Sequence, residues 1–217
     1  MSWTSTLVGL ATALLLAPTG DGRTPLPSAP TAIVPLYSEA SAATSAPAAK
    51  PFISADFNVP TLVETPTFKL VPLGPDLVKI DYDAYMSSIE HLQQTFTRST
   101  DWPHKGITAE DAMRDMLTEQ ARFNSRTSFA YAVLTPDGAR ERGCVYVYPS
   151  PVPGYDAMVS MWVTKAEFDR GFDARLFEWV ARWIKQDWPF ARVAYPGRTI
   201  GWQQWDALVA VHQTKPS

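Results

Sequence analysis

Apolar and polar positions recur with the period of an α-helix in three parts of the chain. Apolar residues at spacings of three and four predict amphipathic helices over residues 80–96, 108–123 and 172–187. The second helix starts at Thr108, and Asp111 three positions later gives the spacing of a capping arrangement. These segments are long enough to cover the faces of a sheet.

Shorter segments have the alternation or the continuous apolar runs of β-strands, and these are residues 68–72, 127–135, 140–150, 156–164 and 190–195. A Pro-Asp-Gly turn at residues 136–138 predicts an antiparallel pair on either side of it. Both faces of the middle strands are apolar, so we expect helices on both sides of the sheet.

The order of these segments predicts the fold class. A crossover helix separates the last two strands, which should therefore be parallel, whereas the earlier strands form a meander. We expect an α+β fold of three layers (αβα), with a mixed, mostly antiparallel central sheet. The closing residues 201–211 have a weak helical pattern, and an extended conformation stays open for them.

The first 65 residues differ in composition from the rest. They are rich in Pro, Ala, Ser and Thr and poor in charge, so residues 1–65 are predicted to be a disordered N-terminal arm and residues 66–217 the folded domain. The apolar run at residues 7–17 is short for a bilayer span and lacks a basic flank and a clear cleavage site. We expect a cytoplasmic protein without a membrane span, with export through this run left open.

The net charge and the metal-binding residue types limit the kinds of ligand that we expect the chain to bind. The formal net charge is −3 and no segment clusters Lys and Arg, which argues against nucleic acid. His91, His104 and His212 are too scattered to form a metal signature, so no metal is predicted. Cys144, the single cysteine, lies in a strand and is interpreted as a packing residue.

The strand, polar turn and helix over residues 156–184 form the candidate site. Gly171 directly precedes the helix, and the first N–H groups of a helix attract phosphate or carboxylate. The alternative is that this turn only reverses the chain.

The order of elements over residues 68–211 resembles the GCN5-related N-acetyltransferase (GNAT) family. In that family the corresponding unit binds acyl-coenzyme A through a loop of pattern Arg/Gln-x-x-Gly-x-Gly/Ala. Residues 168–173 occupy these positions, and only Gly171 matches. Phe168 replaces the first Arg or Gln, and Asp173 replaces the last small residue. The Asp173 carboxylate would lie near the negative charge of the ligand. The alternative is that Asp173 is an early residue of the helix, stabilised by the helix dipole.

The resemblance implies an acetyl-CoA-dependent N-acetyltransferase acting on an unidentified small-molecule or peptide amine. The residues it implies for the cosubstrate are Trp162, Val163, Thr164, Arg170, Gly171, Phe172 and Ala174. Arg170 would replace the lost positive charge, and a strand N–H near Trp162 or Val163 would meet the oxyanion. The alternative, a catalytically inactive GNAT-fold binding or interaction protein, follows from the departures at Phe168 and Asp173.

No residue matches an acid or base motif of the family. Three polar residues at strand ends, Glu141, Asp156 and Tyr195, are candidates for positions near the cleft, with a hydrogen-bonded strand-end role as the alternative. Tyr146 and Tyr148 are interpreted as aromatics of the core and its rim. The oligomeric state is not predicted.

Overall fold

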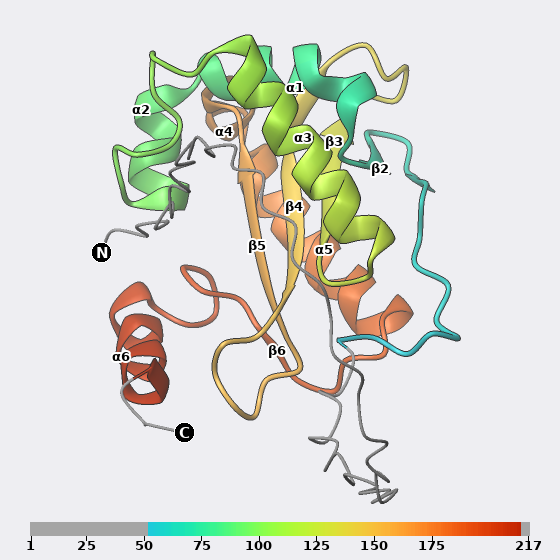
Figure 1. Cartoon of the computed structure of the whole chain (residues 1–217), viewed down its shortest axis with the longest axis vertical. Coiled ribbons are helices and arrows are strands. Elements are labelled where there is room, and N and C mark those ends of the chain that lie inside the picture. The colour runs from blue at the N-terminus through green and yellow to red at the C-terminus, as the bar shows by residue number, and fades with distance from the viewer. Residues whose placement is uncertain (1–51, 214–217) are drawn as a thin grey trace, which may run out of the picture. The chain divides into compact units, whose positions relative to one another are not determined.

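A computed structural model describes residues 52–213, which form a mixed sheet flanked by helices (Figure 1). The strands follow one another across the sheet in chain order. They are β1 (Val63–Glu64), β2 (Lys69–Pro72), β3 (Phe129–Leu134), β4 (Glu141–Pro149), β5 (Ala157–Val163) and β6 (Val193–Ala194). Every neighbouring pair is antiparallel except β5 and β6, which are parallel. The predicted α+β class with a mostly antiparallel sheet is confirmed.

Helices cover both faces of this sheet. They are η1 (Pro75–Leu77), α1 (Val78–Met86), α2 (Ile89–Leu92), the π-helix η2 (Gln93–Thr97), α3 (Ala109–Asn124), α4 (Lys165–Asp169), α5 (Phe172–Asp187) and α6 (Trp202–Gln213). The apolar stripe of α5 packs on one face through Leu176, Val180 and Ile184, whereas Tyr85 of α1 and Met116 of α3 pack on the other. Among the residues described, no helix has the length and apolarity needed to cross a membrane.

Several predicted elements are confirmed with small changes. The helix predicted over residues 108–123 is α3, and Thr108 and Asp111 form a complete capping box at its start. The helix predicted from Phe172 is α5, and α6 resolves the open assignment of the last segment as helical. The predicted parallel strand near residues 190–195 is present but has only two residues in β6.

The prediction of a single helix over residues 80–96 was wrong. The chain leaves the helix at Ser88, whose backbone has φ −140° and ψ 26°, and resumes as α2 and η2. The hydroxyl of Ser87 donates to Ala84 O at 2.6 Å, an example of a serine competing with regular backbone bonds. Ser88 Oγ accepts the Lys165 N–H at 2.9 Å, so the break also joins this segment to α4.

Part of the chain assigned to the N-terminal arm lies in the packed body. Ile53 is 4% exposed, and Phe52, Phe57 and Val63 pack against the same core. Tyr131 Oη donates to Pro60 O at 2.9 Å, which ties this stretch to β3. The boundary predicted at residue 65 thus falls inside the packed chain, and residues 1–51 of the predicted arm lie outside the described residues.

A β-bulge changes the direction of side chains at the start of β4. Val133 pairs with Gly143 whereas Leu134 pairs with Glu141, so Arg142 is the additional residue. As a result Glu141 and Cys144 meet on the α1 side of the sheet, and Arg142 reaches Glu167 of α4. The bulge therefore separates two buried polar groups, one around Cys144 and the other around Glu167.

Replacing Gly143 with alanine should unfold the domain at much lower denaturant. An added Cβ would lie 2.0 Å from Trp162 O and 2.8 Å from Val163 Cα, and neither backbone atom can move without disturbing β5. We expect a loss of at least about 3 kcal/mol in the free energy of unfolding, measured by urea titration. Gly201→Ala is the control, because a Cβ there meets nothing within 4 Å. Equal midpoints for the two variants would contradict this account.

Candidate functional site

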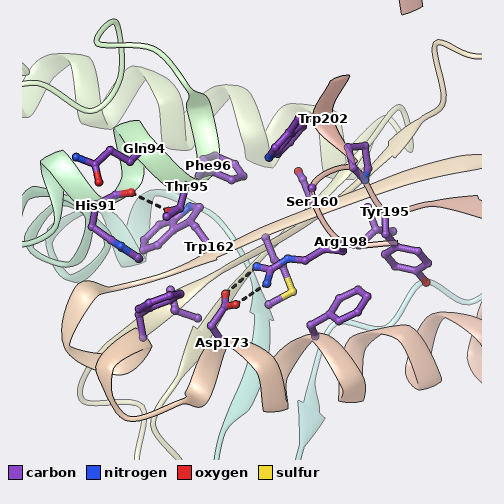
Figure 2. Close-up of a pocket in the computed structure, with 17 residues that line it drawn as sticks. His91, Gln94, Thr95, Phe96, Ser160, Trp162, Asp173, Tyr195, Arg198 and Trp202 are labelled. Atoms are coloured by element: carbon purple, nitrogen blue, oxygen red, sulfur yellow. Dashed lines mark hydrogen bonds and ion pairs between the residues drawn. The ribbon is translucent and has the colours of Figure 1, made fainter. Parts of the chain in front are cut away.

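The parallel strands β5 and β6 separate soon after they meet. Only Ala157↔Val193 and Met158↔Ala194 are paired, and β5 continues to Val163 without β6 beside it. A cavity of about 250 Å³ lies in this opening, between residues 159–163 on one side and the segment Tyr195 to Arg198 on the other (Figure 2). The site is therefore a cleft made where two strands diverge.

The backbone of β5 presents hydrogen-bonding groups to this cleft. Successive residues of a strand direct their N–H and C=O groups to opposite edges. Thr164 N–H donates to Arg142 O of β4 at 3.0 Å, so the groups of Met161 and Val163 face the edge away from β4. An extended ligand in the cleft can pair with these groups as a further strand would.

Side chains from the helices α2, α4 and α6 also line the cleft. His91 and Phe168, from α2 and α4, are in contact with ring centroids 4.8 Å apart, and both line it. Trp202 of α6 lines the opposite side, and the Arg98 guanidinium lies 4.2 Å from the centre of its ring. Arg98 also forms two 2.9 Å hydrogen bonds to the Asp206 carboxylate of α6.

An ion pair lies inside the cleft, where the side chains of Asp173 and Arg198 meet (Figure 2). Asp173 is in the first turn of α5, and its carboxylate receives two hydrogen bonds from the Arg198 guanidinium, one of them 2.7 Å long. A carboxylate at a helix N-terminus is stabilised by the helix dipole. The anion at this end of α5 is thus supplied by the chain itself.

The structure places the predicted cosubstrate residues in two groups. Trp162 and Val163 line the cleft, whereas the other five, Thr164, Arg170, Gly171, Phe172 and Ala174, are not part of its lining. Gly171 has φ 68° and its N–H donates to Phe168 O at 2.8 Å, so that amide is already engaged. The Phe172 side chain is buried in the core below α5.

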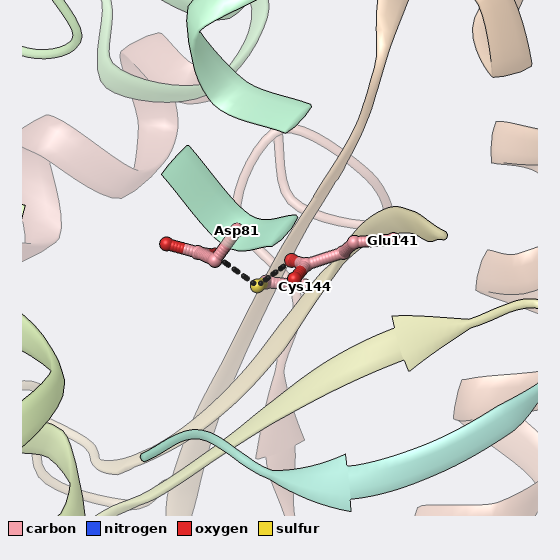
Figure 3. A group of neighbouring side chains, drawn as sticks. All are labelled: Asp81, Glu141 and Cys144. Atoms are coloured by element: carbon pink, nitrogen blue, oxygen red, sulfur yellow. Dashed lines mark hydrogen bonds between the residues drawn. The ribbon is translucent and has the colours of Figure 1, made fainter. Parts of the chain in front are cut away.

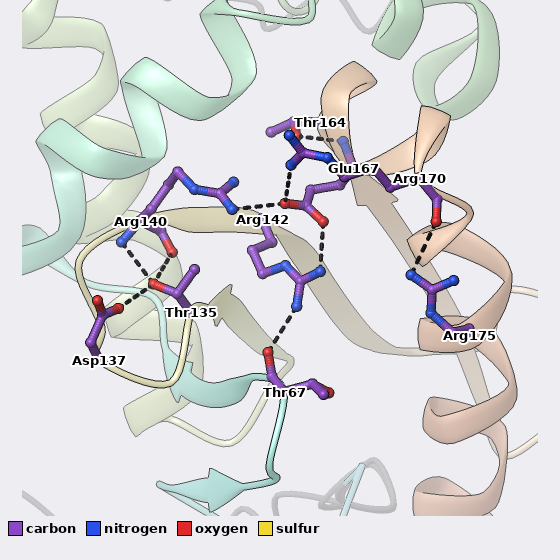
Figure 4. A network of polar contacts seen from close by, with 9 residues as sticks. All are labelled: Thr67, Thr135, Asp137, Arg140, Arg142, Thr164, Glu167, Arg170 and Arg175. Atoms are coloured by element: carbon purple, nitrogen blue, oxygen red, sulfur yellow. Dashed lines mark hydrogen bonds and ion pairs between the residues drawn. The ribbon is translucent and has the colours of Figure 1, made fainter.

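Arg170 is directed toward a buried carboxylate (Figure 4), and it does not line the cleft. Its Nη1 lies 3.6 Å from Glu167 Oε1. Glu167 is 1% exposed and accepts hydrogen bonds from Arg140 at 2.8 Å and Arg142 at 2.6 Å. Burial alone would raise the pKa of Glu167, but these two guanidinium groups outweigh burial and hold it below its ordinary value.

The guanidinium that does reach the cleft, Arg198, was not predicted. It follows the Pro-Gly turn after β6, and the sequence pattern there indicated only the end of a strand. Gly197, in the same turn, has φ 73° and lies against the Trp202 ring. The signal in the sequence that could have indicated Arg198 is its position, a basic residue just after the turn that follows the parallel strand.

Two titratable groups of the cleft have shifted pKa values. Burial lowers the pKa of His91, as does the nearby Lys165 ammonium, so the neutral imidazole is favoured. Burial raises the pKa of Tyr195 to about 12, and its ring packs edge-on against Phe177. Tyr195 is the one of the three strand-end candidates that lines the cleft.

The other two strand-end candidates lie elsewhere. Asp156 Oδ2 accepts the N–H groups of Ala191 and Arg192 at 2.8 and 2.9 Å, so it is a hydrogen-bonded strand-end residue. Glu141 is buried with Asp81 and Cys144 on the other face of the sheet (Figure 3). The Cys144 thiol donates to Glu141 Oε1 at 2.9 Å, and its sulfur lies 3.6 Å from Asp81 Oδ1.

The cluster of Asp81, Glu141 and Cys144 is the candidate metal site within residues 52–213, because one donor atom of each lies within 4.8 Å of the others. Ligands on a tetrahedral zinc ion would place sulfur and oxygen about 3.6 Å apart. The observed 2.9 Å between Cys144 Sγ and Glu141 Oε1 fits a hydrogen bond better. Burial raises the pKa of Asp81 to about 6 and that of Glu141 and Cys144 well above ordinary values, so Glu141 and Cys144 keep their protons and the cluster is held by hydrogen bonds.

The two tyrosines interpreted as core and rim aromatics line the α1 side. Tyr146 Oη accepts the Trp162 indole N–H at 3.2 Å, and the Tyr148 ring stacks on Tyr146 with centroids 5.7 Å apart. Burial raises the pKa of both hydroxyls, so they stay neutral. Neither lines the cleft between β5 and β6.

No protein-family model and no curated protein matches the chain. Among solved structures, it is similar to a ribosomal-protein-S5-alanine acetyltransferase from Vibrio fischeri, with 13% identity, a TM-score of 0.49, and 71% of this chain and 82% of that chain covered. A Salmonella typhimurium acetyl transferase that modifies the N-terminal serine of ribosomal protein L7/L12 has 11% identity and a TM-score of 0.44, covering 57% and 67% of the two chains.

A ribosomal L7/L12 alpha-N-protein acetyltransferase in complex with coenzyme A has 14% identity and a TM-score of 0.45, with 58% of this chain and 70% of that chain covered. The chain is thus similar in structure to GNAT-family acetyltransferases at low identity.

Proposed function

We propose that the chain binds an acyl-CoA thioester, such as acetyl-CoA, in the cleft between β5 and β6 and transfers the acyl group to an amine. The observation that carries this proposal is the early separation of the two parallel strands, which leaves the Met161 and Val163 backbone facing a cavity of about 250 Å³. Amide groups of a pantetheine arm can pair with this edge. The first turn of α5 then lies beside the anionic end of the ligand.

The proposed reaction needs a free amine and a polarised thioester. The nitrogen lone pair forms a bond to the carbonyl carbon, the carbon–sulfur bond breaks, the nitrogen loses a proton, and the departing thiolate gains one. An N–H of Met161 or Val163 stabilises the negative charge that develops on the carbonyl oxygen. Among the hydroxyl groups that line the cleft, which also include Thr95 and Ser160, we assign Tyr195, kept protonated by burial, as the donor of a proton to the thiolate.

The alternative, a non-catalytic binding protein with the same fold, is supported by one observation. The ion pair of Asp173 and Arg198 occupies the place next to α5 where phosphate would bind. A phosphate must displace the Asp173 carboxylate from Arg198 to gain that guanidinium. A chain in which this exchange is unfavourable would bind no coenzyme.

Calorimetric titration with acetyl-CoA separates the two functions. We expect saturable binding, and release of free thiol on addition of an amine. Ser160 lies in the cleft, so Ser160→Phe should fill it and abolish binding while the melting temperature shows a folded chain. Absence of binding by the unchanged chain at millimolar acetyl-CoA would refute the enzyme and leave the non-catalytic function.

A further inference from the structure

A second cavity, of about 290 Å³, lies on the opposite face of the sheet from α5. It is bounded by α1, α3, β4 and the segment from Phe96 to Trp102. Its walls are largely aromatic, formed by Tyr85, Phe96, Trp102, Tyr146 and Tyr148. Trp102 contacts Tyr85 and Phe96 with ring centroids 5.1 and 6.1 Å apart, so the rings form a continuous surface.

The charged side chains lining this cavity are mainly acidic. Asp81, Asp115 and Glu119 contribute three carboxyl groups, against the single guanidinium of Arg122 among the described lining residues. Arg122 is bound to Glu119 Oε1 at 2.7 Å. No salt bridge within residues 52–213 reaches Asp81 or Asp115. The lining of the cavity therefore has more acidic than basic side chains.

Two buried polar atoms of the cavity have no hydrogen-bond partner in the described chain. They are Tyr85 Oη and Glu119 Oε2. Tyr85 is 3% exposed, so its hydroxyl is removed from bulk solvent although it borders the cavity. A buried polar atom without a partner is costly, and such atoms indicate a missing hydrogen-bonding group.

We infer that this cavity binds an organic cation, an ammonium group held by the Asp81 and Glu119 carboxylates with an apolar body against the aromatic walls. An ammonium offers up to three N–H donors, which match the carboxylates and the Tyr85 hydroxyl. The faces of the aromatic rings attract a cation further. Burial raises the pKa of Asp81, Asp115 and Glu119, and at Glu119 it outweighs the opposing effect of the Arg122 guanidinium.

The cavity and the cleft are neighbours that share part of a wall. Phe96 lines both, and the Trp162 indole of the cleft donates to Tyr146 Oη of this cavity at 3.2 Å. We identify the cation with the acceptor amine of the transfer reaction, in which the ammonium first gives a proton to a carboxylate of the cavity and then attacks as the free amine. This identification rests on the proposed function, whereas binding of the cation does not.

Binding is tested on the full chain without coenzyme, by calorimetry with phenethylamine, which is an ammonium ion at neutral pH, and with the uncharged 2-phenylethanol. We expect the ammonium probe to bind at least about tenfold more tightly than the alcohol, the value of a charge-assisted hydrogen bond. Asp81→Asn and Glu119→Gln should each weaken phenethylamine by about tenfold. Asp83→Asn is the matched control on α1, because Asp83 is exposed and pairs with Lys79 outside the cavity.

Equal affinity for the two probes would overturn the inference, as would unchanged phenethylamine binding in both folded cavity variants. Two variants are used because either one alone could disturb folding. A chain that binds phenethylamine and no acetyl-CoA keeps the cation site and refutes the transferase. The reverse result refutes the cation site alone.

Discussion

Replacing Asp173 with alanine is expected to tighten acetyl-CoA binding by about ten- to hundredfold. The variant frees Arg198 and the first turn of α5 from the carboxylate that now occupies them. A hydrogen bond to a charged group is worth about 1.5–3 kcal/mol, which corresponds to that range in dissociation constant. Calorimetric titration of the variant beside the unchanged chain measures the difference.

Two controls connect this result to the phosphates. S-acetylpantetheine lacks the nucleotide and its phosphates, so its affinity should not change in Asp173→Ala. Asp169→Ala, an exposed carboxylate paired with Lys165 on α4, should leave acetyl-CoA binding unchanged, because Asp169 does not line the cleft. Weaker acetyl-CoA binding by folded Asp173→Ala would show that the ion pair supports the site and does not compete with the ligand.

Glu167→Gln should lower the free energy of unfolding by about 3–5 kcal/mol, the usual effect of breaking a buried ion pair from one side. The substitution leaves Arg142, which is 13% exposed, without its 2.6 Å carboxylate partner beside the Phe172 ring. Urea unfolding at neutral pH measures the loss. Glu178→Gln on the exposed face of α5 is the control and should change stability by less than about 0.5 kcal/mol.

The same carboxylate gives a pH dependence with a defined sign. The pKa of Glu167 is lower in the folded chain than its ordinary value of 4.5, so the unfolded chain binds more protons as the pH falls. Its stabilising contribution is complete above the unfolded pKa and is lost as the pH falls through the folded pKa. Unfolding curves of the unchanged chain and Glu167→Gln should therefore converge in acid. A constant difference between them down to low pH would exclude this origin.

The regular elements could be predicted because their signals are local. The apolar ladder of Phe172, Leu176, Val180 and Ile184 fixes the buried face of α5, and the capping box at Thr108 fixes the start of α3. The break at Ser88 could not be predicted in the same way. It depends on a hydrogen bond to Lys165, a residue far along the chain, and helical periodicity continues across it.

The predicted cosubstrate residues of the strand and those of the loop lie in different places. Trp162 and Val163 line the cavity because they end the strand before α5, and their binding of a cosubstrate stays a prediction. Arg170 and Gly171 are outside the lining because residues 165–169 form α4, which turns the Arg170 side chain toward Glu167. The sequence pattern showed a polar turn there. The attraction of Glu167 for three arginines is a tertiary effect that spacing cannot reveal.

Arg98 joins the two sides of the cleft, since it bonds Asp206 of α6 and lies over the Trp202 ring. The ion-pair side chains are 39% and 52% exposed, so salt screens them and the pair contributes at most about 1 kcal/mol. This contact is a weak latch on an otherwise well-packed body. Because Trp205 of α6 is also buried against Val152 and Ala194, breaking this ion pair alone should leave the helix in place.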